Sequence, residues 1–134
     1  MNPDTIFVYG TLRRDANNEM SRLLADHAEF VAYANFRGKL YNIGDYPGAV
    51  PSVDPNDTVP GEVYLLHQAD TALPLLDRYE QFGSGFPEPN EYLRLMQAVL
   101  LENGAMLSAW VYVYNHPTAG LELIEPVNSF HKTL

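Results

Sequence analysis

The sequence has no cysteine, few basic residues and no long apolar run, and each absence excludes a class of protein. Without cysteine the chain forms no disulfide, carries no thiolate nucleophile and has no cysteine-based metal site. Its 8 lysine and arginine residues stand against 17 aspartate and glutamate residues, which gives a formal net charge of -9. Nucleic acid is therefore not an expected partner, because binding to phosphates needs clustered cations. No membrane is expected as a partner either, since no uninterrupted apolar run of about 18 residues occurs.

Motifs for metals and cofactors are also missing. The chain has four histidines, which are His27, His67, His116 and His131. They are far apart and lack the paired spacing of metal ligands. Glycine-rich loops of the Walker and dinucleotide types do not occur, so we expect neither a metal nor a cofactor. The first residues, Met1 to Asp4, carry neither the basic segment nor the apolar run of a signal peptide, which favours a cytoplasmic protein.

The composition that remains is typical of one folded domain, expected to span residues 1–134. Hydrophobic residues make up 46% and charged residues 19% of the chain, as in ordinary globular proteins. A chain of this length buries roughly two thirds of the surface that it exposes when unfolded. Nine tyrosines, six phenylalanines and one tryptophan favour strands and the walls of ligand pockets.

Residue periodicity predicts five or six strands and two helices, joined mostly by turns. Strands are expected over residues 6–9, over 29–40 with a bend at Gly38, over 61–66, and on both sides of the Asn103-Gly104 hairpin turn. The last run, 107–114, is apolar on both faces and is expected to be central. Helices are expected over 19–27 and 72–82, loops over 44–48 and 51–60, and a surface tail from 116. Because strands and helices do not alternate, the pattern favours an α+β fold, a small, mixed and strongly curved β-barrel with flanking helices.

The end of the first strand is a candidate binding turn. Ile6 to Tyr9 has the apolar, β-branched and aromatic residues of a buried strand. Gly10 then permits backbone conformations that a Cβ would obstruct, so the turn can present unpaired NH groups to a ligand. Thr11 adds a hydroxyl group. The alternative is a strand that simply ends in a tight turn.

A candidate catalytic carboxylate lies in the second expected helix. On a helical wheel of about 100° per residue, Glu80 falls inside the apolar arc, between the directions of Leu73 and Leu76. Asp77 falls outside it. A carboxylate on the core-facing side is costly unless it is hydrogen-bonded or neutral, and burial raises its pKa toward the range useful for proton transfer. The alternative is that Glu80 lies at the edge of the arc and reaches water.

Arg94 is a second polar residue in an apolar setting. It alternates with Tyr92 and Met96 along an expected strand. Its guanidinium group is expected either in a cavity or at the rim of the barrel, and the pattern favours neither.

Six short motifs together carry a family resemblance, although none is specific alone. In chain order they are Tyr9-Gly10-Thr11-Leu12, Tyr46-Pro47-Gly48, Gly61-Glu62-Val63-Tyr64, Leu76-Asp77-Arg78-Tyr79-Glu80, Tyr92-Leu93-Arg94 and Trp110-Val111-Tyr112. Over about residues 5 to 115, the chain resembles the gamma-glutamylcyclotransferase-like (AIG2-like) superfamily, in particular its small bacterial branch near gamma-glutamylamine cyclotransferase.

The resemblance implies a small mixed barrel whose cavity is walled by the glycine loop, and it implies that Glu80 is the catalytic glutamate. The family reaction converts a gamma-glutamyl compound to 5-oxoproline and releases a free amine. Backbone NH groups around residues 10–12 would bind the substrate carboxylate or the developing oxyanion. The resemblance implies a small-molecule gamma-glutamyl substrate, and the predicted substrate-binding residues are Tyr9, Gly10, Thr11, Leu12, Tyr46, Tyr92, Arg94 and Tyr112.

Two other functions stay open from the sequence. A non-catalytic barrel would bind a small metabolite in the same cavity, and an interaction module would have no cavity at all. The leaving amine depends on the outer wall of the pocket, which loops 44–60 and 83–90 are expected to build. The sequence carries no signal for the oligomeric state.

Overall fold

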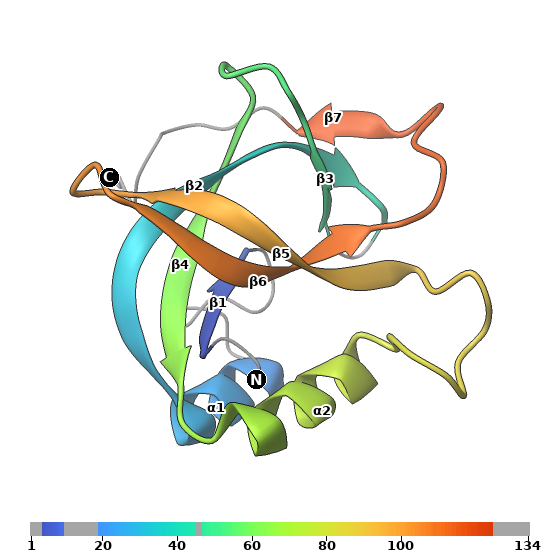
Figure 1. The fold of residues 1–134 in the computed structure, drawn as a ribbon. Coiled ribbons are helices and arrows are strands. Elements are labelled where there is room, and N and C mark those ends of the chain that lie inside the picture. The colour runs from blue at the N-terminus through green and yellow to red at the C-terminus, as the bar shows by residue number, and fades with distance from the viewer. Residues whose placement is uncertain (1–3, 10–18, 45–46, 125–134) are drawn as a thin grey trace.

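The structure, a computed structural model, describes residues 4–9, 19–44 and 47–124 of the chain (Figure 1). The strands in this part are β1 (Thr5–Val8), β2 (Ala28–Asn42), β3 (Pro47–Pro51), β4 (Thr58–Leu66), β5 (Tyr92–Leu101), β6 (Met106–Tyr114) and β7 (Glu122–Ile124). The helices are α1 (Glu19–His27) and α2 (Ala69–Tyr79). The predicted helix over 19–27 and the predicted Asn103-Gly104 hairpin are confirmed.

Five of the described strands close into a barrel. In the order β2, β4, β1, β6 and β5 each strand pairs with the next, and β5 returns to β2 at residues 34–36. The pair β1 and β6 is parallel, and the other pairs are antiparallel. The second half of β2 extends beyond the barrel and pairs with β3 and β7. The structure therefore has the α+β fold, a mixed barrel with flanking helices, that the sequence predicts.

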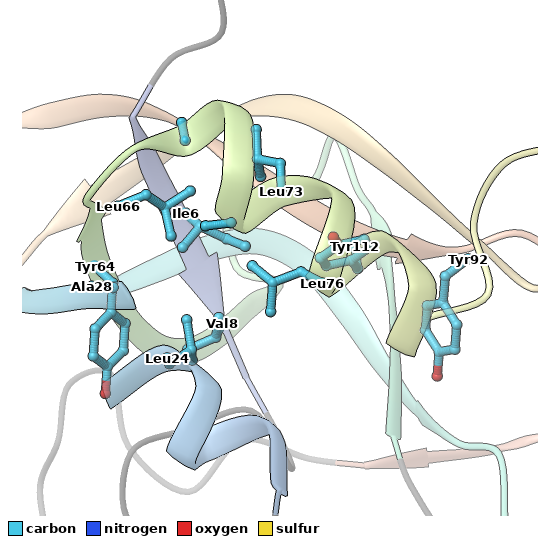
Figure 2. Packing of buried hydrophobic residues seen from close by; sticks show 12 residues of the cluster. Ile6, Val8, Leu24, Ala28, Tyr64, Leu66, Leu73, Leu76, Tyr92 and Tyr112 are labelled. Carbon is cyan, nitrogen blue, oxygen red and sulfur yellow. The ribbon is translucent and has the colours of Figure 1, made fainter. Parts of the chain in front are cut away.

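Strand β1 divides the core into two parts. Its residue Phe7 belongs to the cluster that fills the barrel. Its residues Ile6 and Val8 belong to the cluster between the barrel and the helices, where Figure 2 shows them near Leu24 and Leu73. Both helices lie at one end of the barrel in Figure 1. The prediction that this strand is covered on both faces is confirmed, and each buried side chain of this size contributes about 1.5–3 kcal/mol of burial free energy.

Strand boundaries differ from the prediction at three places. Residues 47–51 form β3 where a turn and the start of a loop are predicted. Strand β4 begins at Thr58, inside the predicted loop. Residues 122–124 form β7 inside the predicted tail. In each case the added residues pair with β2, so the missing signal is a long-range partner and not a local pattern.

Strand β2 continues through Gly38, where its pairing changes from β4 to β3. A Cβ at Gly38 would lie 2.6 Å from the carbonyl oxygen of Val50 and 2.7 Å from the ring of Phe36. Glycine therefore serves the close approach of β3. The irregularity of β2 falls between Phe30 and Ala32, where the register with β4 shifts.

Helix α2 begins and ends three residues earlier than the predicted 72–82. Gln68 is the N-cap residue, with a left-handed φ of 57° and no side-chain cap hydrogen bond, so neither Asp70 nor Thr71 caps the helix. Ala69 and Ala72 are buried, so the buried face of the helix starts at residue 69. Pro74 consequently lies inside the helix, where its missing N–H removes the helical partner of the Asp70 carbonyl.

Candidate active site

Glu80 directly follows the last residue of α2. It is the C-cap, and its N–H donates to the carbonyl oxygen of Leu76 at 3.0 Å. The side chain is partly buried, and this burial raises the pKa of Glu80 from 4.5 to about 7, with a further contribution from the charge of Glu91. Glu80 thus lies at the end of the helix and is nevertheless desolvated.

Tyr9 follows β1 and is buried, with 9% of its surface exposed. Its hydroxyl donates to the carbonyl oxygen of Tyr112 at 2.6 Å and accepts from the N–H of Ala49 at 3.0 Å. Burial raises the pKa of Tyr9, against the effect of the Ala49 hydrogen bond, and the charge of Glu80 raises it further. The Tyr9 hydroxyl therefore links β6 to β3 through its two hydrogen bonds. It also lies near enough to Glu80 for the charge of that carboxylate to affect its pKa.

Arg94 lies against α2 and is ion-paired. Its Nε and Nη2 donate to the two carboxylate oxygens of Asp77 at 2.7 and 3.0 Å. The Tyr112 hydroxyl donates to Asp77 Oδ1 at 2.7 Å. Burial and the Asp77 carboxylate raise the pKa of Tyr112, Arg94 lowers it, and Glu80 adds a smaller increase. The Arg94 side chain is only 14% exposed and has a carboxylate partner, and these contacts do not decide between a cavity and the rim of the barrel.

Tyr92 and Asn90 fasten the segment that leads from α2 to β5. The Tyr92 hydroxyl donates to the carbonyl oxygen of Pro47 at 2.8 Å, and its ring packs edge-on against Tyr114. The Asn90 side chain is buried, accepts from the N–H of Gly83 at 2.8 Å and donates to the carbonyl oxygen of Pro87 at 3.0 Å. The loop after Glu80 is thereby held together by hydrogen bonds from the side chain of Asn90, a residue of the same loop.

Five of the predicted site residues come together at this end of the barrel. They are Tyr9, Glu80, Tyr92, Arg94 and Tyr112. Figure 2 shows Tyr112 beside Leu76 of α2 and Tyr92 toward the end of that helix. The predicted residues Gly10, Thr11, Leu12 and Tyr46 lie outside the described residues.

Two acidic residues of this region were not singled out from the sequence. Asp77 precedes Glu80 by three residues, and residues with this spacing are neighbours on a helix surface. The sequence alone therefore indicates that the two acids lie close together. On the helical wheel Asp77 lies outside the apolar arc, and a wheel carries no information on its partners Arg94 and Tyr112, which belong to the barrel. Glu91 adjoins Tyr92 in the sequence, but its proximity to Glu80 depends on how the loop over 83–90 folds.

The part of the chain that the structure describes holds no group of three or more His, Cys, Asp or Glu side chains suited to a metal ion. Within the same residues, no helix has both the length and the apolar character needed to cross a membrane.

Comparisons with known proteins point to one family. The family model described as "Gamma-glutamyl cyclotransferase, AIG2-like" matches residues 6–130. The gamma-glutamylcyclotransferase family protein YtfP of Escherichia coli K12 is 40% identical over 120 residues, which is 90% of each chain. The gamma-L-glutamyl-butirosin B gamma-glutamyl cyclotransferase of Niallia circulans is 30% identical over 112 residues, or 82% of this chain and 66% of that one.

Solved structures show the same fold. The crystal structure of an AIG2-like protein from mouse aligns with a TM-score of 0.65 and 23% identity, and the alignment covers 96% of this chain and 99% of the mouse protein. At 23% identity this likeness shows a shared fold and nothing more.

Proposed function

The chain belongs to the gamma-glutamyl cyclotransferase, AIG2-like family, and on that basis we propose that it converts a gamma-glutamyl amine or a small gamma-glutamyl peptide to 5-oxoproline and a free amine. The observation that carries the proposal is Glu80, a partly buried carboxyl group whose pKa lies near 7 in a setting of tyrosines. We propose further that residues 1–134 act as one cytoplasmic domain without a metal or cofactor.

The reaction needs one bond made, one bond broken and one proton moved. The α-amino nitrogen of the substrate attacks its own γ-carbonyl carbon and forms the ring C–N bond. The bond from that carbon to the leaving nitrogen then breaks. The proton lost by the attacking amine is the proton gained by the leaving amine, so a single group positioned near both nitrogens can carry it.

Glu80 is suited to carry that proton because its two protonation states are close in free energy at neutral pH. An ordinary glutamate is almost fully ionised there and is a weak acid catalyst. With a pKa near 7, Glu80 can accept the proton as carboxylate and return it as carboxylic acid.

The substrate contacts belong to the proposal as well. Backbone NH groups of residues 10–12 are proposed to bind the substrate carboxylate or the oxyanion, with Tyr46 beside them. The hydroxyls of Tyr9 and Tyr92 already bond to backbone groups, so we propose that their rings wall the pocket and fix its shape. Arg94 and Tyr112 are proposed to border it beneath α2.

The direct test is 5-oxoproline release from a panel of gamma-glutamyl amines and gamma-glutamyl dipeptides by the purified native chain. Release from at least one compound, with an equal amount of free amine, supports the proposal and identifies the leaving group. If no compound of the panel releases 5-oxoproline but some raise the melting temperature of the protein, the result would instead support a non-catalytic barrel that binds the same compounds.

Glu91→Gln is expected to move the acid limb of the rate profile to lower pH. The negative charge of Glu91 opposes ionisation of Glu80 and so raises its pKa. Removing that charge lowers the pKa of Glu80, which leaves more of the carboxylate base at acid pH. The measurement is kcat/KM between about pH 5 and pH 9.

The matched control for this prediction is Glu88→Gln, which removes an exposed carboxylate from the same loop. It should leave the profile unchanged. If both variants shift the limb equally, the effect reflects net charge and not the neighbourhood of Glu80.

A further inference from the structure

The carboxylate of Asp77 connects α2 to two strands of the barrel. It receives two hydrogen bonds from Arg94 on β5, at 2.7 and 3.0 Å, and one from the Tyr112 hydroxyl on β6, at 2.7 Å. Arg94 and Tyr112 are register partners, so both project from the same face of the β5–β6 pair. The Asp77 and Arg94 side chains are 18% and 14% exposed, which makes this a largely desolvated, two-point ion pair.

Aromatic rings fix the partner of Asp77 in place. The guanidinium carbon of Arg94 lies 4.3 Å from the ring centroid of Trp110 and 5.9 Å from that of Phe82. A guanidinium stacked in this way has few alternative rotamers. Its charge is balanced by Asp77, so the main effect of the cluster is to fix geometry.

The turn that begins at Asp77 contains Glu80. The N–H of Phe82 donates to the Asp77 carbonyl oxygen at 2.9 Å, and the N–H of Gln81 donates to that of Arg78 at 3.2 Å. These two bonds form a Schellman motif, with Gln81 in the left-handed region at φ 57°. A residue other than glycine adopts that conformation rarely, so surrounding contacts must hold it. Glu80 therefore lies within this turn, between Asp77 and Phe82.

We propose that Asp77 is a positioning residue, which holds the Glu80 carboxyl group against the barrel by fixing the C-terminal turn of α2 to Arg94 and Tyr112. The proposal rests on the cyclotransferase function for its effect on rate, but its geometry can be tested without turnover. It explains why an ion-paired acid occupies the side of the helix that faces β5 and β6, one turn before the proposed catalytic residue.

The test uses Asp77→Ala, which removes all three hydrogen bonds, and Asp77→Asn, which retains one acceptor oxygen. We expect kcat to fall about 100-fold in the alanine variant and about 10-fold in the asparagine variant, with KM changed by less than about threefold, because misplacement of a reacting group by about 1 Å has effects of this size. Asp70→Asn, an exposed acid in the first turn of the same helix, is the control and should keep the native rate.

A double variant separates positioning from general damage. If Asp77 acts through Glu80, then Asp77→Asn should slow the native chain but should not slow Glu80→Gln any further. Additive losses, or a loss that appears mainly in KM, would overturn the proposal and assign Asp77 to substrate binding or to stability alone.

Two readouts do not depend on turnover. Trp110 is the one tryptophan of the chain, so its emission reports whether the Arg94 stack is disturbed in each variant. NMR titration of labelled glutamate carboxyl carbons follows Glu80, which is expected to titrate closer to an ordinary glutamate in Asp77→Ala because the freed turn lets water in. An unchanged titration alongside a changed Trp110 signal would overturn the proposal even if the native chain proved inactive on every substrate.

Discussion

Glu80→Gln is expected to slow 5-oxoproline release by about 10³-fold at neutral pH. Glutamine has nearly the same shape as glutamate and can still hydrogen-bond, but its amide neither accepts nor returns a proton in this range. Both proton transfers of the proposed reaction would then depend on water. The measurement is initial rate of product release under saturating substrate, with native chain and variant prepared in parallel.

The stability of the same variant provides the control against misfolding. The folded chain keeps the Glu80 proton up to a pKa of about 7, whereas the unfolded chain loses it near 4.5. The ionisable side chain therefore lowers the stability of the native chain as pH rises through this window and has no such effect below it. At pH 8 the variant should be more stable in urea by up to about 3 kcal/mol, and at pH 4 about equally stable.

These two outcomes together decide the role of Glu80. An inactive variant that is more stable at pH 8 shows that a destabilising carboxylate is retained for turnover. A variant that keeps most of its activity would refute the proposed acid and base role, whatever its stability. An inactive variant with lower stability at both pH values would indicate a structural role for Glu80.

How far the sequence predicts the fold depends on whether an element is specified locally. The first strand, the helix over 19–27 and the strand over 107–114 carry their own patterns, and all three are confirmed, with the first strand running from Thr5 to Val8 and Tyr9 just after it. Strands β3 and β7 do not. They are short, one begins and ends with proline, and they become strands because the long β2 extends past the barrel and offers them an edge.

The same distinction applies to the site. The position of Glu80 on a helical wheel indicates a carboxylate near the apolar face, and this survives the correction that the helix ends one residue before it. The partners of that turn cannot be found in this way. Asp77 reaches residues 17 and 35 positions away, and the contact of Tyr9 with Ala49 spans 40 positions. Such contacts follow only from the closure of the barrel.

Gly61→Ala is expected to cause the largest loss of stability among the substitutions proposed for this chain. Gly61 lies in β4, opposite Ala34 of β2 and next to Glu62, which pairs with Val8 at the end of β1. A Cβ at Gly61 would overlap the carbonyl oxygen of Val8 and would lie 2.6 Å from the ring of Phe7. The backbone of a central strand has little room to shift, so we expect a loss of about 3 kcal/mol or more in urea unfolding, or failure to fold.

A second substitution shows which of the two overlaps dominates. Phe7→Leu makes room beside the ring but leaves the Val8 carbonyl where it is, so Phe7→Leu with Gly61→Ala should recover only a small part of the stability, relative to Phe7→Leu alone. Full recovery would show that the ring was the obstacle and that β1 tolerates a side chain beneath it. Partial recovery supports the backbone argument, in which Gly61 is required because β1 approaches β4 closely just before Tyr9. On that argument the glycine sets the path by which the Tyr9 hydroxyl reaches Ala49 and Tyr112, and any refolded variant should have a displaced Tyr9.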